Sequence, residues 1–201
     1  MRLSEKTLEI SLCCQISQRL SITNALWVGL TQRQERELGF DVATRINARM
    51  IILQYKASDT VTQTWHFATP ARRFHLPHQQ LERLQRIAAV FPSCVHYVLP
   101  DIGNTVELAN NADLVSQSWT LDVSQLTNPF PPSGRSSGNH LAYLQPPRCV
   151  ISSDPQEIEP MKLGDFCRKL MDFRANSREM SEWLKRHIEL LRGRKLYGLI
   201  F

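Results

Sequence analysis

The sequence has few of the features that mark membrane-spanning, secreted or zinc-finger proteins. No uninterrupted apolar run approaches the ~18 residues that a membrane-spanning helix needs. The opening MRLSEKTLEISL has no apolar stretch behind a basic segment, so we expect no signal peptide. The cysteine count is odd and contains no CxxC pair: Cys13, Cys14, Cys94, Cys149 and Cys167. These absences argue against a disulfide framework and a zinc knuckle, and we expect a cytoplasmic protein that does not enter a membrane.

What is present is an ordinary globular composition with a small excess of basic residues. The 201 residues are 42% hydrophobic and 21% charged, which suits one domain, or one domain with an appendage. Lys and Arg number 24 against 19 Asp and Glu, a net charge of +5. This excess leans towards a polyanionic partner such as nucleic acid, although basic surfaces also serve solubility alone.

Hydrophobic spacing predicts a mixed α/β fold. Ser4 is a good N-cap for a helix over 4–20, in which apolar side chains recur at helical spacing. Further helical segments are expected at 31–39, 78–90, 162–174 and 177–192, and strands at 25–30, on both sides of Asn47-Ala48, and at 61–69, 95–99 and 119–123. Turn residues fill 127–140 and predict a loop. We therefore expect a core over residues 1–155 and a helical C-terminal extension over residues 156–201.

The stretch from 40 to 57 carries the chemistry. If Asn47-Ala48 close a hairpin, paired positions sum to 95, so Asp41 lies opposite Gln54. Facing residues of antiparallel strands point to the same side of the sheet, and Lys56 shares that side with Gln54 because it lies two residues on. The pattern predicts a carboxylate, an amide oxygen and an ammonium on one face of two adjacent strands. The alternative is that this face of the hairpin is solvated and that Asp41 and Lys56 form only a weak surface ion pair.

The leading helix adds two acids to this picture. At 100° per residue, Glu5 and Glu9 continue the stripe of Leu12, Cys13 and Ile16 towards the helix N-terminus. Burying an unpaired carboxylate is costly, so we expect a cation to meet them, either a metal ion bound by Asp41 or Lys56. Favourable interaction with the helix dipole explains Glu5 equally well, and the deeper Glu9 is the preferred ligand.

The pattern of this stretch resembles that of the PD-(D/E)XK nuclease superfamily, in particular its QxK branch, as in Mrr-like restriction endonucleases. It consists of Asp41, a gap of twelve residues, and then Gln54-Tyr55-Lys56. The resemblance covers about residues 5–57 and, more loosely, 78–99. It departs from the usual pattern at Phe40, where proline is common, and at Gln54, which replaces an acid and removes one negative charge from the site.

The resemblance implies a restriction-endonuclease-like mixed β-sheet flanked by helices and a site for Mg²⁺ or Mn²⁺. Mg²⁺ prefers hard oxygen ligands. The implied ligands are Asp41, the Gln54 side chain, Glu9 or Glu5, and the carbonyl of Tyr55. Lys56 would orient the attacking water and offset charge on the phosphate.

Basic residues near this region are candidates for phosphate contacts: Arg72, Arg73, Arg83 and Arg86. A solvated basic face explains them equally well. The leading hypothesis is a magnesium-dependent nuclease acting on DNA, with a role in defence or restriction implied by the resemblance. The alternative is a catalytically weak or inactive nuclease-fold subunit that binds nucleic acid or a protein partner, as a homodimer or in a larger complex. An unrelated α/β interaction protein is the third possibility if the hairpin register differs.

Overall fold

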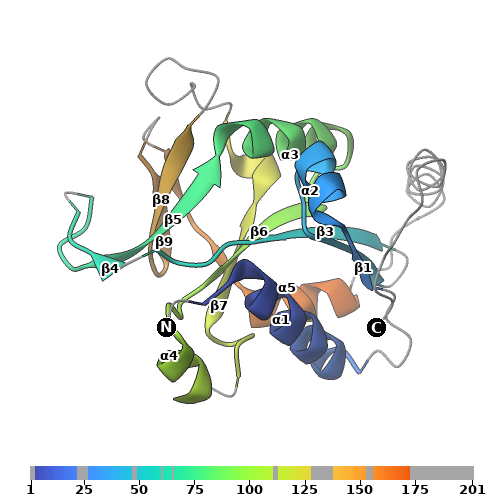
Figure 1. Ribbon diagram of the computed structural model, residues 1–201, viewed down its shortest axis with the longest axis horizontal. Helices are drawn as coiled ribbons and strands as arrows, with labels where there is room; N and C mark the ends of the chain where they lie inside the picture. The colour runs from blue at the N-terminus through green and yellow to red at the C-terminus, as the bar shows by residue number, and fades with distance from the viewer. Residues whose placement is uncertain are drawn as a thin grey trace.

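Two β-sheets form the centre of the protein (Figure 1). The computed structural model describes residues 3–21, 27–46, 49–59, 61–64, 66–110, 113–127, 138–152 and 156–172. Within these residues, one six-stranded sheet has the order β1 (Trp27–Gly29), β2 (Val42–Ile46), β3 (Arg49–Tyr55), β6 (Val95–Pro100), β7 (Ser118–Asp122) and β11 (Met161–Lys162). This sheet is mixed, because β3 and β6 run parallel whereas the other neighbours are antiparallel.

The second sheet is antiparallel throughout and has five described strands. Its order is β10 (Gln156–Ile158), β9 (Arg148–Ile151), β8 (Asn139–Gln145), β5 (Ala71–Pro77) and β4 (Val61–Thr62). Most of this sheet was not predicted from the sequence. One strand was expected over 61–69, whereas β4 ends at Thr62 and a turn follows, in which Thr64 accepts from the backbone N–H of both His66 and Phe67. Such local acceptors compete with strand pairing.

The described helices pack on both faces of the six-stranded sheet (Figure 1). They are α1 (Glu5–Arg19), α2 (Gln32–Leu38), α3 (His78–Val90), α4 (Thr105–Asn110) and α5 (Leu163–Asp172), with a short 3₁₀ helix, η1 (Val123–Gln125). Side chains of α1 and α5 share one buried cluster with the face of β3 that carries Ile51, Leu53 and Tyr55. Side chains of α3 and the second sheet share the other cluster with Met50 and Ile52. β3 is therefore covered on both sides, which explains its uninterrupted apolar run.

The helix starts and stops follow local sequence signals. Ser4 caps α1, since its Oγ accepts from the backbone N–H of Thr7 at 3.0 Å. Thr31 and Gln34 form a capping box at the start of α2. Gly39 ends α2 with φ of 86°, a left-handed conformation that favours glycine. These predictions of helices near the N-terminus and over 78–90 are confirmed.

The region after residue 155 contributes strands as well as a helix. β10 pairs with β9, β11 pairs with β7, and α5 packs against the six-stranded sheet through residues such as Leu163 and Cys167. Residues 156–172 are therefore part of the two sheets and their covering layer. The helix expected over 177–192 and most of the loop expected over 127–140 lie outside the described residues, and β8 begins within that expected loop, at Asn139.

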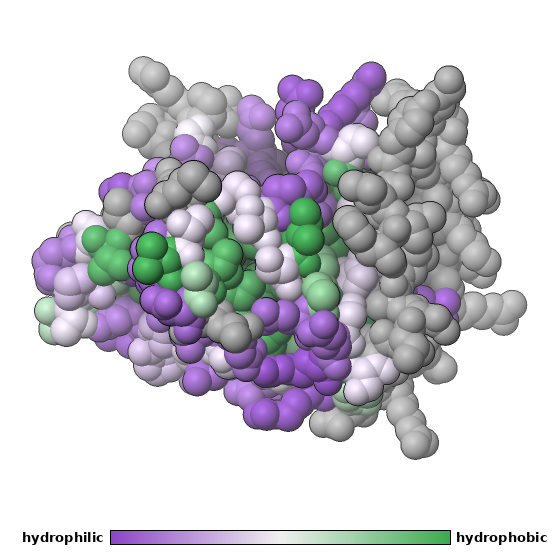
Figure 2. Space-filling model, turned by 60° about the horizontal axis from the view of Figure 1, so that its bottom comes forward, coloured by the Kyte–Doolittle hydropathy of each residue, from purple (hydrophilic) through white to green (hydrophobic). Residues whose placement is uncertain are grey.

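The side of the molecule that carries α1, α4 and α5 has hydrophobic side chains among hydrophilic ones (Figure 2). The exposed large apolar residues of the described part include Ile10, Val106 and Met171, one from each of these helices. Isolated exposed apolar side chains are ordinary on protein surfaces. None of the described helices is long and apolar enough to cross a membrane, and the five cysteines, all described, form no disulfide.

Candidate functional site

The β2–β3 hairpin has the predicted register. Val42 faces Leu53, and the backbone N–H of Asp41 donates to the carbonyl of Leu53 at 3.3 Å. Asp41 directly precedes the last pair of this register, and the Gln54 Nε2 donates to the Asp41 Oδ2 at 2.7 Å. The hairpin register therefore matches the prediction, whereas Glu9, the third member of the predicted constellation, pairs with Lys6.

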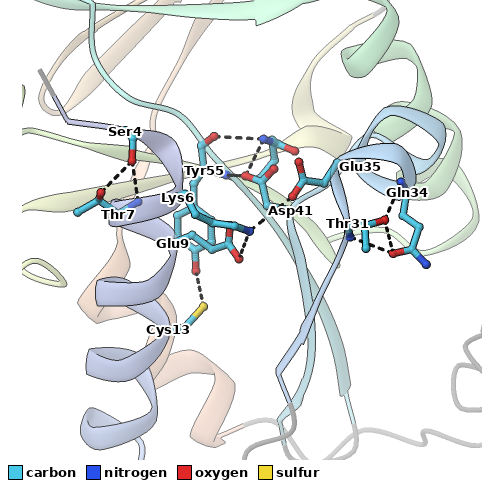
Figure 3. Close-up of polar contacts among 11 residues, drawn as sticks. Ser4, Lys6, Thr7, Glu9, Cys13, Thr31, Gln34, Glu35, Asp41 and Tyr55 are labelled. Carbon is cyan, nitrogen blue, oxygen red and sulfur yellow. Dashed lines mark hydrogen bonds and ion pairs between the residues drawn. The ribbon is translucent and has the colours of Figure 1, made fainter. Parts of the chain in front are cut away.

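Asp41 carries a buried carboxyl group whose pKa is raised. It is 7% exposed, and its Oδ2 accepts a second hydrogen bond, from the backbone N–H of Tyr55 at 2.8 Å (Figure 3). Burial raises the pKa of Asp41 to about 7, although the positive charge of Lys56 and the two hydrogen bonds act to lower it. The negative charge of Glu5 adds to the upward shift. A carboxyl with a pKa near neutrality exchanges its proton readily at physiological pH.

The amide nitrogen of Gln54 is hydrogen-bonded, whereas its amide oxygen has no partner among the described residues. Its Nε2 donates to the Asp41 Oδ2 and also, at 3.1 Å, to the carbonyl oxygen of Tyr55. Its Oε1 is buried and has no hydrogen-bond partner among the described residues, although the side chain is only 1% exposed. A buried carbonyl oxygen without a donor is uncommon and suits a ligand.

The set of oxygen atoms around Asp41 fits a hard cation. The Asp41 carboxylate and the Tyr55 carbonyl already converge on one point, the Gln54 amide nitrogen. The orphaned oxygen of Gln54 belongs to the same amide. Among the described residues, no three His, Cys, Asp or Glu side chains are placed to hold a metal ion. A cation at Asp41 would therefore draw on the amide and carbonyl oxygens, which are suitable ligands for Mg²⁺.

Lys56 is buried at the end of β3 and contacts a helix acid. It is 5% exposed, its Nζ lies 3.4 Å from the Oε1 of Glu5, and its backbone N–H donates to the carbonyl of Val98 on β6. Lys56 is thus the cation that meets Glu5, but the Glu5 side chain is 46% exposed and is not the buried acid that the helical stripe predicted. Glu5, Asp41 and Lys56 form one electrostatic group at the ends of the strands.

Glu9 has a different partner from the one expected. It is 7% exposed, and Lys6, one turn earlier on α1, donates to both of its carboxylate oxygens at 2.9 and 2.7 Å. The Lys6 Nζ also lies 3.6 Å from the Oε1 of Glu35 on α2 (Figure 3). Burial raises the pKa of Glu9, while the hydrogen bond and charge of Lys6 act against the shift. Glu9 is therefore balanced by Lys6, and Glu5 is the helix acid that contacts the hairpin lysine.

Sequence reasoning missed Lys6 and Glu35. The spacing of Lys6 and Glu9, three residues apart on a helix, was a usable signal, because such residues are neighbours on the helix surface. Glu35 offered no comparable signal, because its approach to Lys6 depends on where the fold places α2, which contacts α3, relative to α1.

The four predicted phosphate-binding arginines fall into two groups. Arg72 is held inside the protein by Asp101, 2.5 Å from its Nε, and by Glu107, 2.8 Å from its Nη2. Arg73 pairs with Asp59. Arg83 and Arg86 stand on α3, where Arg86 is exposed and Arg83 is half-buried. The guanidinium groups of Arg72 and Arg73 are therefore engaged in internal ion pairs, and α3 carries the more accessible basic side chains.

No protein-family model, curated protein or solved structure matches this chain.

Proposed function

We propose that this protein is a metal-dependent nuclease that hydrolyses phosphodiester bonds in DNA. The observation that carries the proposal is the contact between Asp41, the residue before β2, and Gln54 on β3, with the buried Gln54 Oε1 lacking a partner among the described residues. The mixed sheet, with α1 on one face and α3 on the other, agrees with the fold that the PD-(D/E)XK resemblance implies.

In the proposed site, Asp41, Gln54 and the Tyr55 carbonyl hold Mg²⁺ or Mn²⁺. A bound cation of this kind polarises a phosphate and lowers the pKa of a nearby water molecule. Asp41 must lose its proton to bind the cation, and its raised pKa places this event near neutral pH. Glu5 is the helix acid best placed to contribute, because it already faces Lys56.

Lys56 supplies a positive charge that is fixed in position. Its burial and its contact with Glu5 limit the conformations of the side chain, so that the ammonium stays beside Asp41. A fixed ammonium can orient a water molecule and offset negative charge that builds up on a phosphate during hydrolysis. The net charge of +5 and the exposed Arg86 on α3 favour a nucleic-acid substrate. A role in defence or restriction follows from the resemblance to Mrr-like enzymes.

The test combines cation binding with cleavage on the same samples. Calorimetric titration of Mn²⁺ and Mg²⁺ is compared between the wild type, Asp41→Asn and Lys56→Met, together with cleavage of double-stranded DNA, single-stranded DNA and RNA. Asp41→Asn is expected to lose cation binding and cleavage, and Lys56→Met to lose cleavage while retaining binding. The exposed Lys162→Met and Glu37→Gln are the matched controls and should behave as the wild type. A wild type that binds neither cation would refute the proposal.

A second candidate is a nuclease-fold subunit that binds nucleic acid or a protein partner without efficient cleavage. Two observations favour it: the Gln54 amide turns a donor towards Asp41, and Lys6 neutralises Glu9. Both reduce the negative charge available to a cation. Cation binding that depends on Asp41 but gives no cleavage of any substrate would favour this candidate over the active nuclease.

A further inference from the structure

The Lys6 ammonium lies among three carboxylates from separate parts of the fold. It donates to both carboxylate oxygens of Glu9 at 2.9 and 2.7 Å and lies 3.6 Å from the Oε1 of Glu35 on α2 (Figure 3). Burial acts to lower the pKa of Lys6, but the hydrogen bond and charge of Glu9 raise it overall. The charges of Glu35 and Asp41 add to that rise, so Asp41 lies within electrostatic reach of the same ammonium.

The two lysines near Asp41 differ in how firmly the protein holds them. Lys56 is 5% exposed, and its backbone N–H donates to a carbonyl of β6. The Lys6 side chain is 54% exposed, whereas the side chain of Glu9, which it neutralises, is 9% exposed. A lysine has a flexible four-carbon stem and a strongly hydrated ammonium, so Lys6 can leave Glu9 for water without opening the core. Of the two positive charges, that of Lys6 is the exchangeable one.

A divalent cation at Asp41 and the Lys6 ammonium would act on the same carboxylates. Like charges in a partly buried region repel each other more strongly than exposed charges in water do. A cation at Asp41 would also supply the nearby positive charge that Glu9 otherwise receives from Lys6. Binding of the cation therefore weakens the ion pair of Lys6, and by reciprocity Lys6 weakens the binding of the cation.

We propose that Lys6 is a built-in competitor of the divalent cation: it neutralises Glu9 and Glu35 in the cation-free protein and swings out into solvent when the cation binds. The inference rests on the proposed function, because it assumes a cation at Asp41. It explains why a buried acid beside the site is paired with a half-exposed lysine. Lys6 thereby raises the cation concentration at which the site fills. An ion pair that served only to stabilise α1 would leave cation binding unaffected.

The first test compares Mg²⁺ binding by calorimetry in the wild-type chain and in Lys6→Met, Lys6→Arg and Lys162→Met at pH 8.5. This pH lies above the pKa of Asp41, about 7, so that ionisation of the carboxyl does not limit binding. Lys6→Met should bind Mg²⁺ about five- to tenfold more tightly than the wild type, at the lower end of coupling between linked sites because Lys6 is half exposed. Lys6→Arg, which keeps the charge, and Lys162→Met, at an exposed position of β11, should bind as the wild type does.

A second measurement follows the Lys6 amine itself. Brief acylation with a limiting amine-reactive reagent, quantified by mass spectrometry, compares Lys6 with Lys162 as an internal reference in the same sample. An amine released from its two acceptor oxygens on Glu9 reacts faster than one that is held by them. Saturating Mg²⁺ should therefore raise the ratio of Lys6 to Lys162 labelling in the wild type and leave it unchanged in Asp41→Asn.

Three results would overturn the inference while leaving the proposed function in place. They are Lys6→Met binding Mg²⁺ no more tightly than the wild type, Lys6→Arg gaining as much affinity as Lys6→Met, and a Lys6 labelling ratio that bound Mg²⁺ does not change. A wild type that binds neither Mg²⁺ nor Mn²⁺ would overturn the proposed function, and this inference with it.

Discussion

One oxygen of Asp41, Oδ2, accepts from both the Gln54 side chain at 2.7 Å and the Tyr55 backbone N–H at 2.8 Å. The two donors come from consecutive residues at the end of β3 and hold the carboxyl in a single orientation, 7% exposed. Even with these donors and the nearby Lys56, burial dominates and keeps the pKa of the carboxyl about three units above that of an exposed aspartate, 3.8 against about 7.

Asp41 should make the protein less stable as the pH rises from about 4 to about 7. Between these values the unfolded chain has released the Asp41 proton while the folded protein still holds it, so the unfolded state gains relative stability with rising pH. Asp41→Asn removes the titration and should raise the free energy of unfolding at pH 8 by up to about 4 kcal/mol relative to the wild type, with little difference at pH 4. Urea unfolding at both pH values, with Glu37→Gln as an exposed control, measures the effect; equal pH dependence in all three proteins would contradict it.

The buried histidine pair His78–His140 should have the opposite effect: it should lower the free energy of unfolding as the pH falls. The His78 Nδ1 lies 2.8 Å from the His140 Nε2, and burial followed by the charge of His78 lowers the pKa of His140. The folded protein therefore resists protonation that the unfolded chain accepts, and stability falls as the pH drops through about 6.5. His140→Gln, which can hydrogen-bond but does not titrate, should flatten this acid-side loss. Urea unfolding from pH 7.5 down to pH 5 provides the comparison, and an unchanged slope would rule out His140 as the cause.

Lys6 should control the titration of Glu9. Its hydrogen bond and charge lower the pKa of Glu9 against the effect of burial, so Lys6→Met is expected to raise that pKa further. Because the Lys6 side chain is 54% exposed, the free energy of unfolding should change by less than about 1 kcal/mol. A carbon-detected NMR titration of the Glu9 carboxyl measures the shift, with Lys6→Arg as the charge-conserving control. The same Glu9 pKa in wild type and Lys6→Met would show that the ion pair is weak in solution.

Substitution of Arg72 should affect mainly stability, whereas substitution of Arg86 should affect mainly nucleic-acid binding. Arg72 joins β5 to Asp101 and Glu107, and its side chain is 14% exposed, so Arg72→Ala should lower the free energy of unfolding by about 1–3 kcal/mol. Arg86→Ala, on the exposed face of α3, should leave unfolding unchanged but weaken DNA binding and reduce its salt dependence by about one counterion. Chemical denaturation and DNA binding at several salt concentrations measure the two effects. If Arg72→Ala weakened DNA binding and Arg86→Ala did not, Arg72 and not Arg86 would be the residue that contacts the nucleic acid.

The features that depend on residues close in the chain were predictable. The N-cap at Ser4 and the glycine end of α2 follow from backbone chemistry within a few residues. The hairpin register follows from a short loop and from alternation, because a slip of one residue would turn every side chain to the wrong face. The contact between Asp41 and Gln54 is a consequence of that register, and the sequence alone was enough to predict it.

The tertiary structure decided the rest, because contacts between distant segments leave no pattern in either segment alone. β5 pairs with β8 across more than sixty residues of chain, from Arg72 opposite Leu144 to Pro77 opposite Asn139. The same limit applies to charges. Whether Glu9 meets Lys6 or Lys56, and whether Arg72 faces solvent or Asp101, depends on how helices and strands pack, since a long charged side chain has several partners within reach until packing selects one.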